Sequence, residues 1–251
     1  MNFLSYDLSY YALSALAVLI TLTVHEYAHA YAAYKMGDPT AKNMGRLTLN
    51  PLKHLDPFGA LCMLFFRIGW AKPVPINARN FKNPRRGFAI SAFAGPLTNL
   101  IVAFFSAPII LVLYRPLASL LASGNYNDFT FNLIYNTLLF FEFFYSVNIG
   151  IALFNLIPVP PLDGSRILGL LLPPKHYFAI MRHERTIYYV LLGWLFVGDL
   201  ISDAILTLPF IASNQLLAIP AFCLSLSNIL AFLCNGLSDL IIGFWSLFPI
   251  F

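Results

Sequence analysis

Apolar positions in this chain gather into long runs instead of alternating with polar ones. Such runs cover about residues 10–34, 88–113, 132–157 and 186–211. Each is long enough to cross, as a helix, the roughly 30 Å hydrocarbon core of a bilayer. A further apolar stretch, about residues 217–248, is interrupted by scattered polar residues and a proline. The pattern predicts an all-α polytopic membrane protein with four to five transmembrane helices.

Composition supports a membrane protein over a soluble domain. The 251 residues are 59% hydrophobic and 10% charged, and the mean hydropathy is +0.74. Soluble domains carry about 25% charged residues, so this chain lacks the charge to cover a water-facing surface. Its three cysteines form no CxxC pair, and we interpret them as small apolar packing residues rather than disulfide partners or zinc ligands.

The region between the first two apolar runs, Lys35 to Gly87, is polar and rich in proline. It contains one short apolar patch, Gly59 to Trp70, of about 12 residues, which is too short for a full span. We expect this patch to be a re-entrant or interfacial segment.

The basic residues predict the orientation of the chain in the membrane. Ten of the fifteen Lys and Arg lie between Lys35 and Arg86, four more lie between residues 166 and 185, and Arg115 is alone between the second and third runs. The positive-inside rule places the two basic loops in the cytoplasm and the N-terminus outside. Basic loops also bind nucleic acids or membrane surfaces in other proteins. Topology accounts for them here, so no nucleic-acid partner is expected.

The first apolar run contains a pattern typical of a metal site, His25-Glu26-Tyr27-Ala28-His29. Residues four apart share one face of a helix, so His25 and His29 can reach one ion. In this HExxH arrangement the histidines bind zinc and the glutamate acts as general base. The alternative, a polar face packed against another helix, leaves the spacing unexplained. Ionisable groups inside a membrane are costly and mark functional sites.

The depth of this motif follows from helix geometry. His25 lies fifteen residues after Tyr10, where the first run begins. At about 1.5 Å per residue this is roughly 22 Å into a core of about 30 Å. The site is therefore expected inside the bilayer, nearer its cytoplasmic face, with water reaching it from that side.

Catalytic zinc usually has three protein ligands, and Asp163 is the best third candidate. It follows the third apolar run, after Pro158, Pro160 and Pro161, which prevent a regular helix. Irregular backbone at membrane depth is tolerated where it lines a cavity. A structural interpretation, a cap before Gly164, explains Asp163 equally well from spacing alone.

Other ionisable residues lie in the apolar runs. Glu142, in the third run, is expected either to hydrogen-bond within the helix bundle or to act in gating or substrate binding. Asp199, Asp203 and Asp239 are interpreted as a polar seam between helices or as an outer boundary, without a chemical role.

The sequence resembles the site-2 proteases, which are intramembrane zinc metalloproteases. The resemblance covers roughly residues 10–200 and is specific because several motifs occur in order. They are His25 to His29, Leu49-Asn50-Pro51, His54-Leu55-Asp56-Pro57, Gly69-Trp70-Ala71-Lys72-Pro73-Val74-Pro75, Gly95-Pro96-Leu97-Thr98-Asn99, and Asn155 through Gly164.

The resemblance implies that His25, His29 and Asp163 bind one Zn²⁺ and that Glu26 activates the water bound to it. It also implies a substrate role for two asparagines. Asn99 would donate to the substrate or the oxyanion, whereas Asn155 would steady the substrate backbone.

The resemblance further implies a membrane-associated β-hairpin between the first two spans, at about Leu47 to Ile76. The expected partners are a transmembrane protein or peptide substrate and the lipid bilayer, in a bacterial cytoplasmic membrane. The sequence matches the compact bacterial type, without PDZ or CBS domain. We expect residues 1–211 to form the metalloprotease core and residues 212–251 an apolar C-terminal extension with a candidate fifth span. No oligomeric state is predicted.

Two other functions compete with intramembrane proteolysis. A catalytically silent membrane-protein binder or chaperone of the same fold has no need of Glu26. A metal transporter predicts ionisable residues distributed across the bilayer, whereas His25, Glu26, His29 and Asp163 are expected at one depth.

Overall fold

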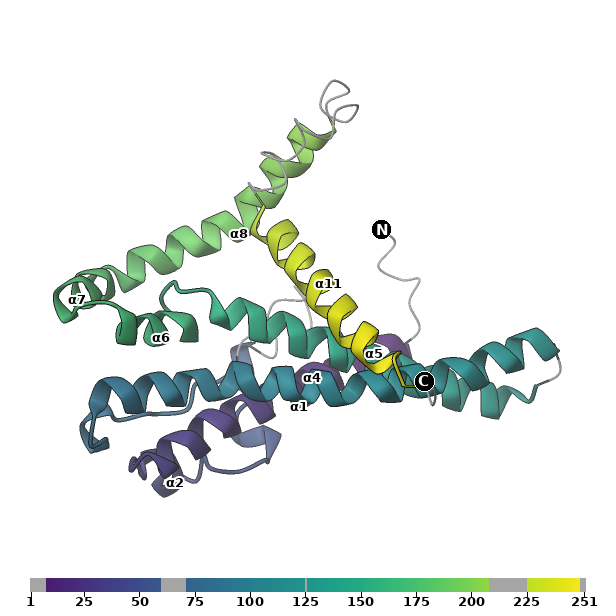
Figure 1. The fold of residues 1–251 in the computed structure, drawn as a ribbon, viewed down its shortest axis with the longest axis horizontal. Coiled ribbons are helices and arrows are strands. Elements are labelled where there is room, and N and C mark those ends of the chain that lie inside the picture. Colours follow the sequence, from purple (N-terminus) through teal and green to yellow (C-terminus); the bar gives the residue numbers. More distant parts are fainter. Residues whose placement is uncertain (1–7, 60–70, 125, 208–224, 249–251) are drawn as a thin grey trace.

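The computed structural model describes residues 8–59, 71–124, 126–207 and 225–248, most of them in helices (Figure 1). Five of the described helices are long and apolar enough to cross a membrane. These lengths confirm the predicted all-α polytopic class, and the protein is an integral membrane protein. The five helices are α1 (Leu8–Lys35), α4 (Pro84–Ser123), α5 (Asp128–Leu156), α8 (Glu184–Leu206) and α11 (Leu226–Trp245).

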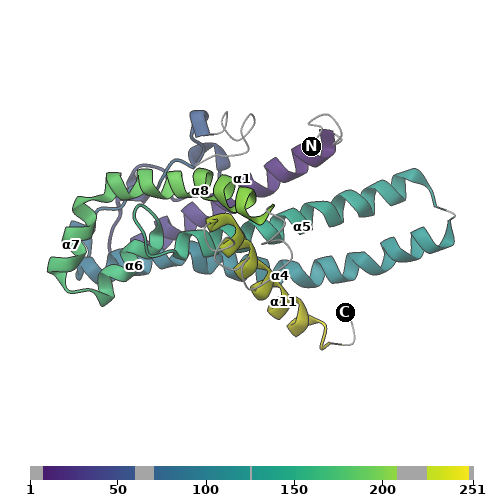
Figure 2. The ribbon, with the colours of Figure 1, turned by 90° about the horizontal axis from the view of Figure 1, so that it is seen from above.

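The centre of the fold is an antiparallel pair of long helices, α4 and α5 (Figures 1 and 2). The Asn83 side chain caps the start of α4 by accepting from the Arg86 N–H, and Pro84 occupies the first turn, where no donor is needed. The Asn127 side chain caps α5 in the same way. Buried alanines of α4, Ala103 and Ala107, permit close approach of the two backbones, as small residues do between membrane helices.

Helix α1 packs against both members of this pair. In the buried contact, the Asn148 side-chain amide donates to the Thr21 hydroxyl at 2.9 Å. Thr21 lies one turn before His25, so this hydrogen bond ties the part of α1 that carries His25 and His29 to α5. Hydrogen bonds of this kind between membrane helices contribute about 1 kcal/mol.

The C-terminal helices α8 and α11 contact each other, and α11 also packs on α4 and α5. The Trp245 indole N–H donates to the Phe104 carbonyl at 2.9 Å. Between α8 and α11, Asp199 accepts hydrogen bonds from the Ser225 and Ser227 hydroxyls. The predicted polar seam is therefore present at Asp199, whereas Asp203 and Asp239 are exposed. No chemical role is assigned to any of these three aspartates.

The predicted β-hairpin at Leu47–Ile76 is not supported. Its described residues form a 3-10 turn, η1 (Pro51–Lys53), a helical stretch at 57–59, and irregular or extended chain. They share a single antiparallel bridge, between Leu55 and Ala71. Prolines lack the N–H that a β-ladder requires, and this region is rich in them. Nearly all of the predicted re-entrant patch lies outside the described residues.

The proline-rich stretch after α5 ends that helix at Leu156, as predicted. The chain then turns into two short helices, α6 (Asp163–Leu171) and α7 (Pro174–Arg182). The first turn of α6 lies so close to the end of α5 that a Cβ at Gly164 would be 2.3 Å from the Leu156 carbonyl oxygen. Only glycine fits there, and its small size sets the position of Asp163.

Both basic loops lie at the same end of the molecule. The start of α4 packs on α6, and the Arg85 guanidinium donates to the carbonyls of Gly169 and Leu172. Figures 1 and 2 place α6, α7 and the start of α4 together, opposite the α4–α5 connection. That these loops lie on the cytoplasmic side of the membrane stays a prediction.

Candidate metal centre and active site

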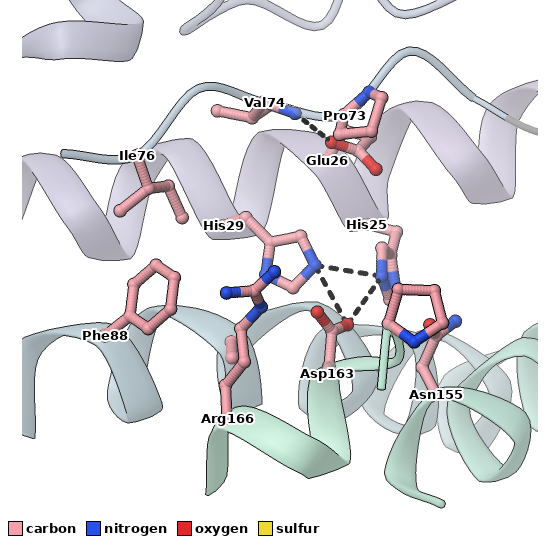
Figure 3. A pocket seen from close by; sticks show the side chains of 12 residues that line it. His25, Glu26, His29, Pro73, Val74, Ile76, Phe88, Asn155, Asp163 and Arg166 are labelled. Carbon is pink, nitrogen blue, oxygen red and sulfur yellow. Dashed lines mark hydrogen bonds and ion pairs between the residues drawn. The ribbon is translucent and has the colours of Figure 1, made fainter. Parts of the chain in front are cut away.

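The two histidines of the HExxH motif face each other on α1. The Nε2 atoms of His25 and His29 are 3.0 Å apart, and both side chains are buried. This geometry follows from the helical period, which places residues four apart on one face. Glu26 lies beside them, half-buried, and its carboxylate is turned toward the segment around Val74 (Figure 3).

Asp163 completes a cluster of three potential ligands. Its Oδ2 atom is 3.2 Å from His25 Nε2 and 3.1 Å from His29 Nε2. Asp163 is the first residue of α6, and Leu162 occupies the cap position before it. The Asp163 carboxylate points at the histidines (Figure 3).

The spacing of these atoms suits a zinc ion. Zinc–nitrogen and zinc–oxygen bonds are about 2.0–2.1 Å, so ligand atoms at the corners of a tetrahedron lie about 3.3 Å apart. The three atoms here are separated by 3.0 to 3.2 Å. Two imidazoles and one carboxylate form a donor set typical of catalytic zinc. Among the described residues, this cluster has the composition and spacing of a metal site.

His25 and His29 stabilise the charged form of the Asp163 carboxyl group. Burial alone would raise the pKa of this carboxyl, but hydrogen bonds and charge from His25 and His29 hold it well below its ordinary value. Asp163 is therefore a carboxylate at neutral pH, which is the form that binds a cation.

Helix α4 supports the histidines from behind. The Nδ1 atom of His29 is 2.7 Å from the Ser91 carbonyl oxygen, a contact that fixes ring orientation in metal sites. One turn later Gly95 lies against both rings, since a Cβ there would be 2.5 Å from His29 Cε1 and 2.7 Å from His25 Cε1. The motif Gly95-Pro96 therefore has a steric role that the sequence did not reveal.

A cavity of about 490 Å³ opens beside the three ligand atoms. Its walls come from four stretches of the chain, residues 25–29, 73–76, 88–92 and 155–166 (Figure 3). The lining residues are His25, Glu26, His29, Pro73, Val74, Ile76, Phe88, Ala92, Asn155, Pro161, Asp163 and Arg166.

The structure treats the two predicted asparagines differently. Asn155 lines the cavity near the end of α5, and its side-chain amide donates to the Ile151 carbonyl one turn earlier. Asn99 lies on α4, one turn after Gly95, and is fully buried. It does not line the cavity, and neither of its polar side-chain atoms has a hydrogen-bond partner among the described residues.

Sequence reasoning gave no site role to several cavity residues, among them Val74, Phe88 and Arg166. Val74 donates its backbone N–H to Glu26 Oε2 at 2.8 Å, a contact that no side-chain pattern can indicate. Arg166 stacks over the Phe88 ring, with 4.5 Å between its Cζ atom and the ring centroid. Arg166 follows Asp163 by three residues on α6, so the sequence could indicate that both side chains lie on the same helix face. The position of Phe88, on another helix, could not be predicted in this way.

Glu142 lies away from this cluster. Its Oε1 atom accepts a hydrogen bond from the Tyr114 hydroxyl at 2.5 Å, across the α4–α5 pair, and it does not line the cavity. Of the two roles considered for Glu142, the structure supports the hydrogen-bonded one.

Comparisons with known proteins agree with this site. A family model described as Peptidase family M50 matches residues 13–197. The protein named "Putative zinc metalloprotease YwhC" of Bacillus subtilis (strain 168) is 44% identical over 175 residues, covering 69% of this chain and 75% of that protein. "Putative zinc metalloprotease Rip2" of Mycobacterium tuberculosis (strain ATCC 35801 / TMC 107 / Erdman) is 26% identical over 193 residues, covering 71% and 68%. No solved structure matches the chain.

A zinc-type ligand cluster beside a glutamate, set among membrane-length helices, defines a membrane metalloprotease. The chain belongs to peptidase family M50, the site-2 protease family, and is a zinc metalloprotease.

The contact between Gly95 and the histidines leads to a testable result. Gly95→Ala is expected to displace both rings, because its Cβ would overlap them, and to lower zinc affinity about 10- to 100-fold, as other changes to ligand orientation do. Zinc content measured after dialysis against buffered zinc checks this. Gly150→Ala is the matched control, because a Cβ there meets nothing within 4 Å. Equal zinc affinity in the two variants would contradict the steric role.

Proposed function

We propose that this metalloprotease hydrolyses peptide bonds within or next to transmembrane segments of membrane-protein substrates, as in regulated intramembrane proteolysis. The observation that carries the proposal is the position of the ligand cluster and its cavity. His25 and His29 lie on a membrane-length helix, and the cavity is walled by α1, α4, α5 and α6 together with residues 73–76.

One zinc ion is proposed, held by His25, His29 and Asp163. The ligand spacing and the donor set described above support this assignment. When bound, zinc lowers the pKa of a coordinated water toward neutrality and polarises the scissile carbonyl.

Glu26 is the proposed general base. Its carboxylate lines the same cavity as the ligand atoms, and one of its oxygens is held by the Val74 N–H. A carboxylate has a second oxygen that can accept a proton. Glu26 takes the proton from the attacking water and delivers it to the leaving amine. Glu26 is therefore the only proton-transfer group that the proposed mechanism needs, because the same carboxylate removes the proton from water and later donates it to the amine.

Asn155 is the proposed contact for the substrate backbone, because it lines the cavity close to Asp163. For Asn99 a contact with substrate stays a prediction, since its side chain is buried outside the cavity lining.

The substrate is proposed to be a transmembrane helix or its remnant. In a helix the peptide carbonyls are engaged in hydrogen bonds, so the substrate must unwind locally before it enters the cavity. Residues that weaken a helix should favour cleavage. The proposed catalytic core is residues 1–211, consistent with the family match to residues 13–197, and residues 212–251 are proposed as an extension whose α11 packs on it.

The proposed location is a bacterial cytoplasmic membrane, with the N-terminus outside and the active site near the cytoplasmic face. Ten Lys and Arg at 35–86, and four more at 166–185, support this orientation. Cysteines placed at Lys175 and Asp128, which lie at opposite ends of the bundle, should react with an impermeant reagent only at Asp128 in intact cells. Labelling at Lys175 alone would reverse the orientation.

Zinc removal tests the proposed reaction. The purified protein, with a tagged single-span substrate in detergent, is expected to lose cleavage when a chelator removes zinc. Cleavage should return on addition of Zn²⁺ and not of Mg²⁺, because imidazole ligands favour zinc. Fragments identified by mass spectrometry should begin within or beside the membrane segment. Cleavage by protein shown to be free of zinc, or cuts only in soluble parts of the substrate, would overturn the proposal.

A further inference from the structure

Residues 72–77 form one wall of the active-site cavity. Pro73, Val74 and Ile76 line the cavity, and the backbone N–H of Val74 donates to Glu26 Oε2 at 2.8 Å (Figure 3). The wall therefore touches the proposed general base through main-chain atoms. Two buried charged residues, one near each end of this segment, hold it in place.

At the first end, Arg46 holds two consecutive carbonyl groups. Its Nη2 atom donates to the carbonyl of Lys72 at 2.6 Å and to that of Pro73 at 3.4 Å. The Arg46 side chain belongs to a residue only 7% exposed. Burial of a cation is costly unless it is hydrogen-bonded, so these carbonyls also stabilise the charge. Residue 46 is itself fixed, since its N–H donates to the Ala41 carbonyl at 2.8 Å.

At the other end, the Asp38 carboxylate binds the chain just after the cavity. Its Oδ2 atom accepts from the Asn77 N–H, and its Oδ1 atom accepts from the Asn80 side chain, each at 2.7 Å. Asp38 is fully buried. Burial would raise the pKa of this carboxyl, but hydrogen bonds from Thr40, Asn80 and Asn77 lower it below its ordinary value. The carboxylate is therefore charged at neutral pH.

The composition of the wall makes it stiff. Proline restricts φ to about −65° and restricts the residue before it as well. Pro73 and Pro75 flank Val74, so the backbone of Val74 has little freedom once the two ends are held. A carboxylate held by such a backbone N–H loses less entropy on reaching the reactive geometry.

We infer that residues 72–77 position the general base. Arg46 and Asp38 hold this segment so that the Val74 N–H fixes the orientation of the Glu26 carboxylate at the wall of the cavity that also contains the proposed metal ligands. Arg46 and Asp38 are positioning residues, since they act through Val74 and do not line the cavity. The inference rests on the proposed function for the role of Glu26, and its first test is independent of cleavage.

Hydrogen exchange tests the contact itself. In the sequence Pro73-Val74-Pro75-Ile76 only Val74 and Ile76 carry an amide hydrogen, so the exchange measured over these residues comes from two amides, one of which is Val74. Protection is expected in the wild type and in Glu26→Gln, whose side-chain carbonyl still accepts a hydrogen bond. Glu26→Ala should exchange faster at this position. Equal exchange in all three proteins overturns the inference, even if no substrate is ever found.

Kinetics test the consequence for catalysis. Val74→Pro removes the N–H donor together with the Val74 side chain, and it is expected to lower kcat about 10- to 100-fold, the range for loss of an orienting contact, with zinc content unchanged. Val74→Ala keeps the donor and removes contacts with substrate, so its effect should fall on KM. A fall in kcat of equal size in both variants, with zinc retained, overturns the inference.

Arg46 gives a second, separate variant in case Val74→Pro does not fold. Arg46→Met should speed exchange of the Val74 amide and lower kcat about 10-fold or more, and Arg46→Lys should restore part of both. Arg79→Met is the control, because Arg79 is exposed and belongs to the same loop region. Val74 exchange and kcat that are the same in Arg46→Met and Arg79→Met overturn the role of Arg46.

Discussion

Glu26→Gln is expected to reduce cleavage by about 10²- to 10⁴-fold, the range that a general base contributes, while the protein still binds zinc. The amide has nearly the shape of the carboxylate and can keep the contact with the Val74 N–H, but it cannot accept the proton. Initial rates on a tagged single-span substrate measure the loss, and metal analysis of the same preparation measures zinc per chain.

The control for this variant is a carboxylate that lies outside the cavity. Glu142 is such a residue, because it bonds to Tyr114 between α4 and α5. Glu142→Gln should therefore retain most of the activity. Wild-type cleavage by Glu26→Gln would show that Glu26 is not the base. The same result would revive the alternative of a binder whose activity belongs to another protein in the preparation.

Asp163→Asn is expected to lose both zinc and activity. The carboxylate oxygen lies 3.1 to 3.2 Å from the two histidine nitrogens, and a neutral amide is a much weaker ligand for Zn²⁺. Loss of a ligand should weaken zinc binding by more than the 10- to 100-fold known for supporting residues. Zinc content after dialysis against buffered zinc, together with the initial rate, checks both parts.

Asp203→Asn is the matched control, because Asp203 is an exposed carboxylate on α8. The two catalytic variants should differ in one respect: Glu26→Gln keeps its zinc, whereas Asp163→Asn does not. Full zinc binding by Asp163→Asn would remove Asp163 from the ligand set and would leave the site with two histidines.

The membrane architecture could be predicted from the sequence because it depends on length and hydropathy. A run long enough to cross the bilayer must satisfy its backbone hydrogen bonds internally, and a helix does this without help from distant residues. The predicted spans therefore match α1, α4, α5 and α8 to within several residues at most ends. Helix α4 extends beyond its apolar run, to Ser123, because it continues to pack against α5.

The histidine pair was predictable for the same reason. Positions four apart on a helix meet on one face, and the structure places the Nε2 atoms of His25 and His29 3.0 Å apart. The spacing and residue types therefore indicated a metal before any fold was known. Glu26 was also assigned from its place between them, although the direction of its carboxylate was not.

The role of Asp163 could not be predicted from the local sequence pattern. Its position before Gly164 suited a cap and a ligand equally, because both interpretations use the same residue types. The packing of α6 against the end of α5, permitted by the absence of a Cβ at Gly164, turns the carboxylate to the histidines. This packing joins residues far apart in the chain, and no short sequence window contains it.

In the region before α4 the sequence predicted a structure that the protein does not form. A resemblance to relatives predicted a hairpin at Leu47–Ile76, yet its described residues share only the bridge between Leu55 and Ala71. Buried polar side chains hold this chain instead, among them Arg46 on the Lys72 carbonyl. Their partners are backbone atoms, which every residue carries, so the sequence contains no sign of which pair will meet.

The transmembrane spans, the uneven distribution of basic residues and the histidine pair could thus be predicted from the sequence. Each depends on residue type and on spacing along the chain, without contacts between distant segments. The approach of Asp163 to the histidines, the glycine contact behind them and the wall beside Glu26 were decided only by the packing of α1, α4 and α6 and of residues 72–77. Their geometry depends on steric fit and on main-chain hydrogen bonds between distant segments.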